Sequence, residues 1–325
     1  MSLERLMQQR LEKIARWHEL GIEPYAYRYP ASHHAADLQA RGAEVAETPG
    51  EVVRVAGRIM TLRGHGKAGF AHLLDGSGRI QVYFRKDQLG DQFARYELLD
   101  EGDWIGVEGP LFRTRTGEIT VRANQLELLS KAIRPLPDKW HGLKDPDTRY
   151  RQRYADLFMN LPVRETFRRR ARLTTAIRGF LDARGYLEVE TPILQPLYGG
   201  AFARPFVTEH HALGLPLYLR ISNELYLKRL IVGGFERVYE FSRDFRNEGI
   251  DRTHNPEFTL LEYYQAFADV HDMMDLTEAL FVHAIRAVSP DTRLTWQGET
   301  FDFTPPWPRR SMLDEVSAKV GERVH

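Results

Sequence analysis

A proline-rich, charged segment near the middle of the chain divides it into two parts that differ in sequence pattern. The segment begins with Arg134-Pro135-Leu136-Pro137-Asp138-Lys139 and runs to about Tyr154. Such a succession of prolines and charges is typical of a domain boundary, because prolines interrupt helices and strands. The length of 325 residues also exceeds the usual size of one domain. The sequence therefore predicts a helical extension over residues 1–50, a β-domain over 51–133, a linker over 134–157 and a second domain over 158–325.

The composition excludes several classes of protein. The chain has no cysteine, which excludes a disulfide framework, thiolate zinc sites and a cysteine nucleophile. Its 45 basic and 45 acidic residues cancel, which argues against a protein that coats nucleic acid with its whole surface. No apolar run approaches the ~20 residues that span a bilayer, and the start of the chain does not resemble a signal peptide. We therefore expect a cytoplasmic protein that makes no membrane contact.

The first part of the chain is predicted to form a helix followed by a small β-barrel. Apolar residues recur with helical spacing over residues 2–20, and the weak pattern over 25–50 indicates a short helix and loops. Residues 52–130 alternate in the manner of about five short strands, with a helix over 87–98 between the third and the fourth. This order is that of an OB-fold, although other small barrels and sandwiches share the pattern.

The second part mixes helices with antiparallel strands, so the chain as a whole is predicted to be α+β. The expected elements are a helix over 163–184, strands over 186–190 and 217–222, a helix over 223–232 capped by Ser222, paired strands over 237–246 and 257–266, a helix over 270–288, a hairpin turned at Gln297-Gly298, and a helix that starts near Ser311 and continues to the end of the chain. The loop between the two paired strands carries the most informative chemistry.

The common nucleotide-binding and zinc motifs are absent from the sequence. Neither G-x-x-x-x-G-K-[ST] nor G-x-G-x-x-G occurs, and there is no H-E-x-x-H. Gly64-His65-Gly66-Lys67 lies between predicted strands with the wrong spacing for a phosphate loop, and we interpret it as a turn. His33-His34 and His210-His211 are interpreted as loop histidines. A nucleotide site in this chain must therefore use another arrangement.

The loop between the paired strands gathers side chains that suit a nucleotide. Arg243, Arg246, Arg252 and His254 surround the loop, and Phe258 begins the returning strand. Arginine can hold phosphate oxygens bidentately, and an aromatic ring can stack on a base. The pattern favours a nucleotide site, although a solvated hairpin with surface ion pairs is the alternative for each residue taken alone.

The returning strand also predicts what lies beside the base. Successive side chains of a strand alternate between its two faces, so Phe258, Leu260, Glu262 and Tyr264 share one face. A nucleotide that stacks on Phe258 would therefore have the carboxylate of Glu262 and the phenol of Tyr264 farther along the same face of the strand.

The same stretch resembles motif 2 of the class II lysyl-tRNA synthetases. The matching residues are Phe245-Arg246-Asn247-Glu248-Gly249 and His254-Asn255-Pro256-Glu257-Phe258-Thr259. Tyr186-Leu187-Glu188-Val189-Glu190-Thr191-Pro192 is similar to motif 1, and further similarity covers Gly199-Gly200-Ala201, Ala203-Arg204-Pro205-Phe206, Glu224-Leu225-Tyr226-Leu227-Lys228-Arg229-Leu230, and the segments 134–139 and 149–154. The resemblance follows almost the whole chain in the right order.

The resemblance implies a fold, an activity and partners. It implies an anticodon-binding OB-fold followed by a class II catalytic domain with an antiparallel sheet flanked by helices. Such an enzyme condenses L-lysine with ATP to lysyl-adenylate, releases pyrophosphate and transfers lysine to the 3′ end of tRNA(Lys), with Mg²⁺ bound to the ATP. The motif 1 helix and strand imply a homodimer.

The resemblance also implies roles for individual residues. Arg246 would be the catalytic residue that holds the α-phosphate and the lysine carboxylate, and the other ATP-binding residues would be Glu248, His254, Asn255 and Phe258. The lysine-binding residues would be Gly200, Glu224, Glu262 and Tyr264. The anticodon-binding residues would be Phe70, Gln81 and Glu118. For Phe70, a place in the barrel core is the alternative to base stacking.

Motif 3 of the family, with its arginine and the acidic residues that hold magnesium, has no counterpart before His325. We therefore expect a chain truncated before motif 3, inactive by itself, and without metal ligands of its own. A non-catalytic protein that binds tRNA or dimerises is the alternative. An aspartyl or asparaginyl ligase is disfavoured, because Glu224 and Glu262 would repel an acidic substrate. Asn223 and Glu209-His210-His211 are minor departures from the family pattern.

Overall fold

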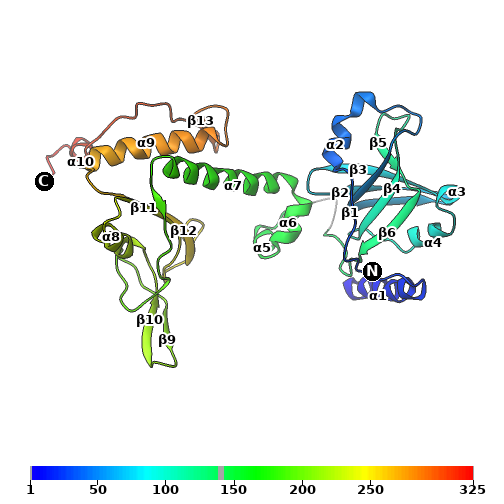
Figure 1. The fold of residues 1–325 in the computed structure, drawn as a ribbon, viewed down its shortest axis with the longest axis horizontal. Coiled ribbons are helices and arrows are strands. Elements are labelled where there is room, and N and C mark those ends of the chain that lie inside the picture. The colour runs from blue at the N-terminus through cyan, green and yellow to red at the C-terminus, as the bar shows by residue number, and fades with distance from the viewer. Residues whose placement is uncertain (1, 138–142, 325) are drawn as a thin grey trace. The chain divides into compact units, whose positions relative to one another are not determined.

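The computed structural model describes residues 2–137 and 143–324, and these fall into two compact units (Figure 1). The units are Met1–Asn160 and Leu161–His325. Asp138-Lys139 of the predicted linker lies outside the described residues. Two short helices, α5 (Pro146–Arg151) and α6 (Arg153–Met159), occupy the second half of that linker. The first of them begins there because Asp145 caps it, accepting a hydrogen bond from the Thr148 amide at 2.7 Å.

The first unit is built around a closed barrel, which confirms the predicted OB-fold. Its strands are β1 (Val52–His65), β2 (Ala68–Leu74), β3 (Arg79–Arg85), β4 (Trp104–Arg113), β5 (Ile119–Arg122) and β6 (Gln125–Ser130). The strand order is β1-β2-β3-β5-β4, and pairing of β1 with β4 closes the barrel. Strand β6 also pairs with β4. The turn between β1 and β2 falls at Gly66-Lys67, as predicted.

The predicted fifth strand is divided into β5 and β6, which meet β4 one after the other. Between them the amide of Ala123 donates to the Tyr83 carbonyl, and that of Asn124 to the Glu108 carbonyl, both at 2.8 Å. The crossing requires a glycine on β4, because a Cβ at Gly109 would lie 1.7 Å from the carbonyl oxygen of Arg122.

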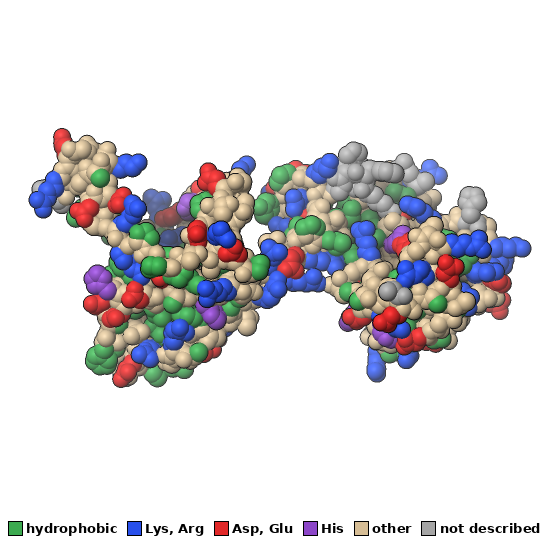
Figure 2. Space-filling model, turned by 90° about the horizontal axis from the view of Figure 1, so that it is seen from above, with side chains coloured by type: hydrophobic (Ala, Val, Ile, Leu, Met, Phe, Trp, Pro, Cys, Tyr) green, Lys and Arg blue, Asp and Glu red, His purple; other side chains and the backbone are tan. Residues whose placement is uncertain are grey.

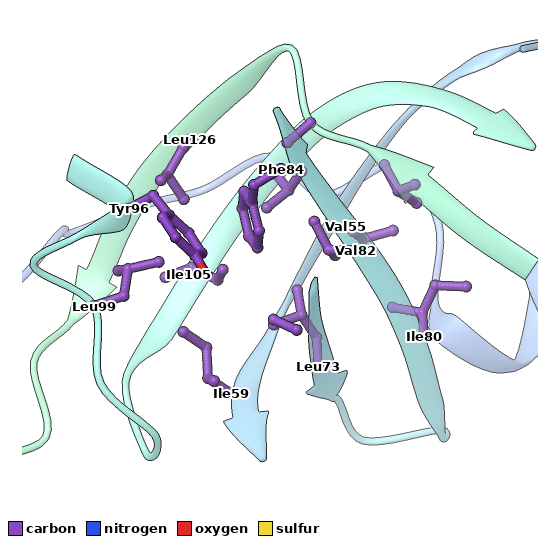
Figure 3. Close-up of a cluster of buried hydrophobic side chains, with 14 of the residues drawn as sticks. Val55, Ile59, Leu73, Ile80, Val82, Phe84, Tyr96, Leu99, Ile105 and Leu126 are labelled. Carbon is purple, nitrogen blue, oxygen red and sulfur yellow. The ribbon is translucent and has the colours of Figure 1, made fainter. Parts of the chain in front are cut away.

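The barrel interior is filled by alternating apolar side chains that point toward one another (Figure 3). They include Val55, Ile59, Leu73, Ile80, Val82, Phe84, Ile105 and Leu126, all of which are fully or almost fully buried. Burial of each such side chain stabilises the fold by about 1.5–3 kcal/mol. The interior is therefore a packed core, and ligands can contact only the outside of the barrel.

The predicted helix between β3 and β4 is broken into three short pieces. They are α3 (Lys86–Leu89), the 3-10 turn η2 (Gly90–Gln92) and α4 (Phe93–Tyr96). Gly90 has a positive φ of 54°, which an α-helix cannot contain. The break turns Tyr96 onto the core, where its ring lies 4.9 Å from that of Phe84.

The N-terminal extension is attached to the barrel by helix α1 (Leu3–Glu19), and Ser2 caps this helix. Trp17 is completely buried in the barrel core cluster. Arg10 is also buried, and its guanidinium donates to the backbone carbonyls of Ala132, Arg134 and Glu101 at 2.8–3.1 Å. A short helix α2 (Ala35–Ala40) and a 3-10 turn η1 (Gly42–Glu44) follow, in agreement with the weak pattern there.

The second unit combines small sheets with two long helices. Its elements are α7 (Leu161–Asp182), β7 (Leu187–Glu188), β8 (Leu194–Gln195), β9 (Val207–His210), β10 (Leu215–Leu219), α8 (Glu224–Val232), β11 (Arg237–Phe245), β12 (Glu257–Gln265), α9 (Val270–Arg286), β13 (Arg293–Trp296), β14 (Glu299–Asp302) and α10 (Met312–Val320). The sheets have the orders β12-β11-β7, β8-β10-β9 and β13-β14. Helices α7 and α9 pack on the first sheet through Phe180, Leu181, Tyr239 and Leu280.

The expected end of the last helix and the expected loop position of His210 are both wrong. The last helix does not continue to the end of the chain, because Gly321 adopts a left-handed conformation (φ 77°) and ends α10 at Val320. His210 is not a loop residue, since it is the last residue of β9. All four residues of β9 are exposed, so the strand has no apolar alternation from which it could be predicted.

Acidic and basic side chains are interspersed over the visible face of both units (Figure 2), in agreement with the net charge of zero. Within residues 2–137 and 143–324, no helix has the length and apolar character needed to cross a membrane.

Candidate functional site

Strands β11 and β12 pair in a register that brings the predicted site residues onto one face. Phe258 lies opposite Asp244, Glu262 opposite Glu240, and Tyr264 opposite Val238. The intervening residues Phe241, Leu261 and Tyr263 pack against the core beneath α7 and α9. The alternation read from the sequence is therefore confirmed, with one apolar face and one polar face.

A buried network of hydrogen bonds fixes the floor of this face. Arg220 Nη1 donates to Glu240 Oε1 at 2.7 Å and to the carbonyl of Thr191 at 3.0 Å. The other oxygen of Glu240 accepts from the Thr191 hydroxyl at 2.7 Å and from the Asn223 amide at 3.0 Å. Such a network is rigid, because each group that left it would be an unpaired polar group in a low-dielectric interior.

Sequence reasoning missed Arg220 and Glu240, although a signal was present. Arg220 follows directly on the apolar strand β10, and Glu240 lies inside the apolar run of β11. Charged residues in buried strands must be paired. Two such residues of opposite charge therefore predict an ion pair, but not the distance in sequence over which it forms.

Glu262 lies next to this network, and two hydroxyl groups donate hydrogen bonds to its carboxylate. Ser222 Oγ donates to Glu262 Oε1 at 2.9 Å, and Tyr264 Oη donates to Glu262 Oε2 at 3.2 Å. Burial raises the pKa of Tyr264, and the charges of Glu262 and Glu224 raise it further. The phenol therefore stays protonated and remains a hydrogen-bond donor to the carboxylate.

Glu224 and Gly200 lie together at the start of helix α8. A Cβ at Gly200 would lie 2.9 Å from the Cβ of Glu224 and 2.8 Å from Ser222 Oγ, so the Gly200 backbone packs closely against both. Gly200 also has a positive φ of 87°. The Glu224 carboxylate contacts Lys228 Nζ at 2.6 Å on the exposed side.

The helix that carries Glu224 begins one residue later than predicted, with Asn223 in the N-cap position. Ser222 is not the cap residue itself. Its hydroxyl oxygen nevertheless accepts a hydrogen bond from the first helical amide, that of Glu224, at 3.1 Å.

Arg246 and Phe258 meet at the end of the hairpin where the connecting loop joins β11 to β12. The guanidinium carbon of Arg246 lies 5.1 Å from the ring centroid of Phe258, in a cation–π contact. Arg246 Nε is buried and has no hydrogen-bond partner within the described part of the chain. The Arg246 amide donates to the Pro256 carbonyl at 2.9 Å, which closes the loop. A positive group with an unused donor thus lies over an aromatic face.

Glu248, His254 and Asn255 lie on the exposed loop beyond this pair. No hydrogen bond or ring contact joins them to Arg246 or Phe258 among the described residues. His254 Nδ1 instead bonds the carboxylate of Asp251 at 2.8 Å. The structure brings Arg246 together with Phe258, and Glu262 with Tyr264, but leaves the three loop residues apart from both pairs.

Asp251 organises that loop and was not recognised in the sequence as doing so. Its carboxylate accepts from the amides of Thr253 at 2.7 Å and His254 at 2.8 Å. These backbone hydrogen bonds, with those from the two side chains, lower the pKa of Asp251. An Asp two residues before Thr is a common turn signal, and could have indicated the bend.

The predicted anticodon residues lie on the outside of the barrel. Gln81 Nε2 donates to Glu118 Oε2 at 2.6 Å, and Thr120 Oγ1 donates to Gln81 Oε1 at 2.7 Å. Glu118 Oε1 lies 2.8 Å from His72 Nε2, and His72 was not singled out in the sequence. The result is a polar cluster held in place by its own hydrogen bonds.

Phe70 borders this cluster and does not belong to the core. Its side chain is 38% exposed, which excludes the alternative of a core position. The ring stacks on Tyr83, with centroids 4.5 Å apart and planes inclined by 19°. Phe70, His72 and Gln81 line a cavity of about 360 Å³. The face therefore offers an aromatic platform next to an amide and a carboxylate.

Metal ligands are not gathered anywhere in residues 2–137 and 143–324. No group of three or more His, Cys, Asp or Glu side chains is placed there to hold a metal ion. On the hairpin face, the Glu262 carboxylate accepts from two hydroxyls, and the Glu240 carboxylate accepts from a hydroxyl, an amide and a guanidinium.

The barrel and the hairpin face together define a class of protein: a class II aminoacyl-tRNA synthetase domain preceded by a nucleic-acid-binding OB-fold. Residues 53–129 match the family model for the OB-fold nucleic acid binding domain. Residues 145–323, more than half of the chain, match the model for tRNA synthetases class II (D, K and N). The chain belongs to this family of class II tRNA synthetases.

Several curated relatives are similar to the chain over almost its whole length. A lysine–tRNA ligase of Carboxydothermus hydrogenoformans is 52% identical over 98% of the chain. Those of Syntrophomonas wolfei and Dehalococcoides mccartyi are 51% and 50% identical over 99% of it. The chain spans 65% of the length of each of these three relatives.

Proposed function

We propose that the chain carries the amino-acid, ATP and anticodon sites of a lysine–tRNA ligase. Such a ligase activates L-lysine with ATP to lysyl-adenylate and transfers the lysyl group to the 3′ end of tRNA(Lys). The observation that carries the proposal is Glu262, a half-buried carboxylate oriented by Ser222 and Tyr264 on the hairpin face. The name of the curated relatives supports the same substrate.

The two carboxylates of the face suit lysine better than the other amino acids of the family group. Lysine has two ammonium groups, and a buried cation needs a carboxylate partner. Glu262 and Tyr264 would receive the ε-ammonium, while Glu224 and the Gly200 backbone would receive the α-amino group. An aspartate side chain would be repelled by Glu262, and an asparagine side chain would leave that carboxylate without a counter-charge.

The nucleotide would lie at the Arg246 end of the same face. The adenine would stack on Phe258, and Arg246 would hold the α-phosphate together with the lysine carboxylate. Its guanidinium would stabilise the negative charge that develops as the carboxylate attacks phosphorus. Glu248, His254 and Asn255 would contact the adenine and the outer phosphates once the loop folds over the nucleotide.

ATP is used by such ligases as its Mg²⁺ complex, which neutralises the triphosphate charge. Among the described residues, no group of three or more His, Asp or Glu side chains is gathered to hold a metal ion. We therefore assign no step of the reaction to a metal ligand of this chain.

The outer face of the barrel would bind the anticodon. A single-stranded base can stack on the exposed ring of Phe70, which Tyr83 supports from behind. Gln81 and Glu118 would then read the polar edge of a uracil-rich anticodon. The hydrogen bonds between these two side chains fix their orientation before RNA binds.

The working form is proposed to be a homodimer in the cytoplasm. Leu187 and Ile193, within and next to the segment that resembles motif 1, are exposed apolar side chains. Apolar surface of this kind is covered when two copies associate, and a two-fold dimer is the commonest arrangement.

Equilibrium dialysis of the chain against radiolabelled amino acids tests the proposal. L-lysine should bind, while L-aspartate and L-asparagine at the same concentration should not. Binding of aspartate or asparagine in preference to lysine would assign the site to another member of the family group. A chain that binds tRNA but none of these amino acids would support the non-catalytic alternative.

A further inference from the structure

Asp244 is a completely buried carboxylic acid on strand β11 of the hairpin. Its side chain has no exposed surface, and it lies opposite Phe258 in the strand pairing. Neither carboxylate oxygen has a hydrogen-bond partner of good geometry among the described residues, although the nearby hydroxyl of Ser242 lowers the pKa of the group. Arg220 Nε lies 3.1 Å from Asp244 Oδ1, but its N–H is directed to the carbonyl of Arg243 at 2.9 Å. The ion pair therefore provides charge without a hydrogen bond.

Arg220 forms ion pairs with both Asp244 and Glu240, so its single positive charge does not fully balance the charge of Asp244. The same guanidinium donates to Glu240 at 2.7 Å, and Glu262 is the third carboxylate of the cluster. Among the described residues, the charged groups that act most strongly on Asp244 are the cation Arg220 and the anions Glu262 and Glu240. Burial raises the pKa of Asp244 to about 6, Arg220 and the Ser242 hydroxyl oppose this rise, and Glu262 and Glu240 add to it.

We propose that Asp244 is a positioning residue that couples amino-acid binding to the release of a proton. Below about pH 6 its carboxyl group carries a proton in the empty site. A cationic amino acid beside Glu262 supplies the missing positive charge, and Asp244 then ionises. The inference rests on the proposed function, because it takes lysine as the cation that fills the site.

The coupling has a definite sign. A cation favours the ionised form of Asp244, so by reciprocity the ionised form favours the cation. Lysine should therefore bind more tightly as the pH rises through the range in which Asp244 titrates. If occupation lowers the pKa of Asp244 by one unit, the affinity changes by about tenfold. Lysine itself keeps both ammonium groups and its carboxylate charged over this range.

The test is the lysine dissociation constant of the chain between about pH 5.5 and pH 7.5, measured by equilibrium dialysis. The variants are Asp244→Asn, which keeps the shape but cannot ionise, and Glu257→Gln as the matched control. Glu257 is the first residue of the paired strand β12, and its side chain is exposed. Because the pKa of the empty site, about 6, lies inside this interval, wild type and control should gain about threefold in affinity, whereas Asp244→Asn should change less than about 1.5-fold. His254 is present in all three proteins, so any contribution from it remains in Asp244→Asn.

Thermal unfolding without ligand gives a second, independent result. The pKa of Asp244 is raised in the folded state, so the stabilisation by its bound proton is present at low pH and is lost as the pH rises toward about 6. The melting temperature of wild type should therefore fall over this range relative to that of Asp244→Asn. Parallel melting profiles would overturn the inference.

The outcomes separate the inference from the proposed function. If lysine binds but its affinity does not depend on pH, or if Asp244→Asn keeps the full dependence, the inference is wrong and the function stands. If no variant binds lysine at any pH, the proposed function is contradicted, and with it the coupling.

Discussion

Arg220 donates a 2.7 Å hydrogen bond to Glu240, and each of the two side chains is only 4% exposed. Twenty residues separate them in the chain, and they join the end of β10 to the middle of β11. Glu240 lies opposite Glu262 in the strand pairing. The ion pair therefore supports Glu262, the residue whose carboxylate is proposed to bind the lysine side chain. The geometry of the site therefore depends on residues that need not touch a substrate.

Removal of Arg220 should be strongly destabilising. Arg220→Met leaves Glu240 and Asp244 buried without their cation, and loss of one partner of a buried ion pair costs about 3–5 kcal/mol. Urea unfolding of the chain measures the loss. The control is Arg293→Met, whose partner Asp291 is 3.3 Å away in an exposed pair. That substitution should cost no more than about 1 kcal/mol. Equal effects of the two would contradict a supporting role for Arg220.

Glu262→Gln should weaken lysine binding while leaving ATP binding nearly unchanged. The amide keeps the shape of the carboxylate, but its oxygen can accept from only one of the two hydroxyl positions while its NH2 donates at the other, and it lacks the counter-charge for an ammonium. Isothermal titration with lysine and with ATP separates the two effects. A parallel loss of both affinities would indicate damage to the β11–β12 hairpin instead of a lost charge contact.

Arg246→Ala should abolish lysine-dependent ATP–pyrophosphate exchange by the protein that contains this chain. Loss of one group that stabilises a developing negative charge reduces the rate by about 10²–10³-fold. Arg243→Ala is the comparison, since Arg243 lies on the same strand with an exposed side chain paired to Glu257. Exchange by Arg246→Ala within a few-fold of wild type would remove Arg246 from the proposed role.

Phe70→Ala should weaken tRNA binding by about 1–3 kcal/mol, the usual contribution of a base stacked on an aromatic ring. The fold should tolerate the change, because the ring is on the outside of the barrel. Phe84→Ala, which empties a buried position, should instead destabilise the barrel by about 3–5 kcal/mol. Filter binding with tRNA and thermal unfolding measure the two quantities. Unfolding of Phe70→Ala would show that the ring is structural.

Much of this arrangement was predictable because it follows from local pattern. The period-2 alternation in β12 placed Phe258, Glu262 and Tyr264 on one face, and the register with β11 agrees with it. The succession of short strands in the barrel followed from alternation and turns in the sequence. Both predictions rest on local pattern, where the chain itself sets the geometry. The pairings of β1 with β4 and of β3 with β5 instead join segments that are distant in sequence.

The features that could not be predicted depend on contacts between distant segments or on the backbone conformation of single residues. The Arg220–Glu240–Thr191 network joins three separate segments, and no spacing rule connects them. The position of Phe70 outside the core could not be decided from an alternation that allows either face. The bend at Gly90 and the end of α10 at Gly321 both depend on glycines with positive φ, which the periodicity of apolar residues does not reveal.

The central claim is that the β11–β12 face activates lysine. ATP–pyrophosphate exchange by the protein that contains this chain, with each of the twenty standard amino acids supplied in turn, tests it most directly. The account predicts exchange with L-lysine, and a loss of that exchange in Glu262→Gln that high ATP does not restore. Exchange supported by L-aspartate or L-asparagine, or lysine-dependent exchange that is unchanged in Glu262→Gln, would contradict it.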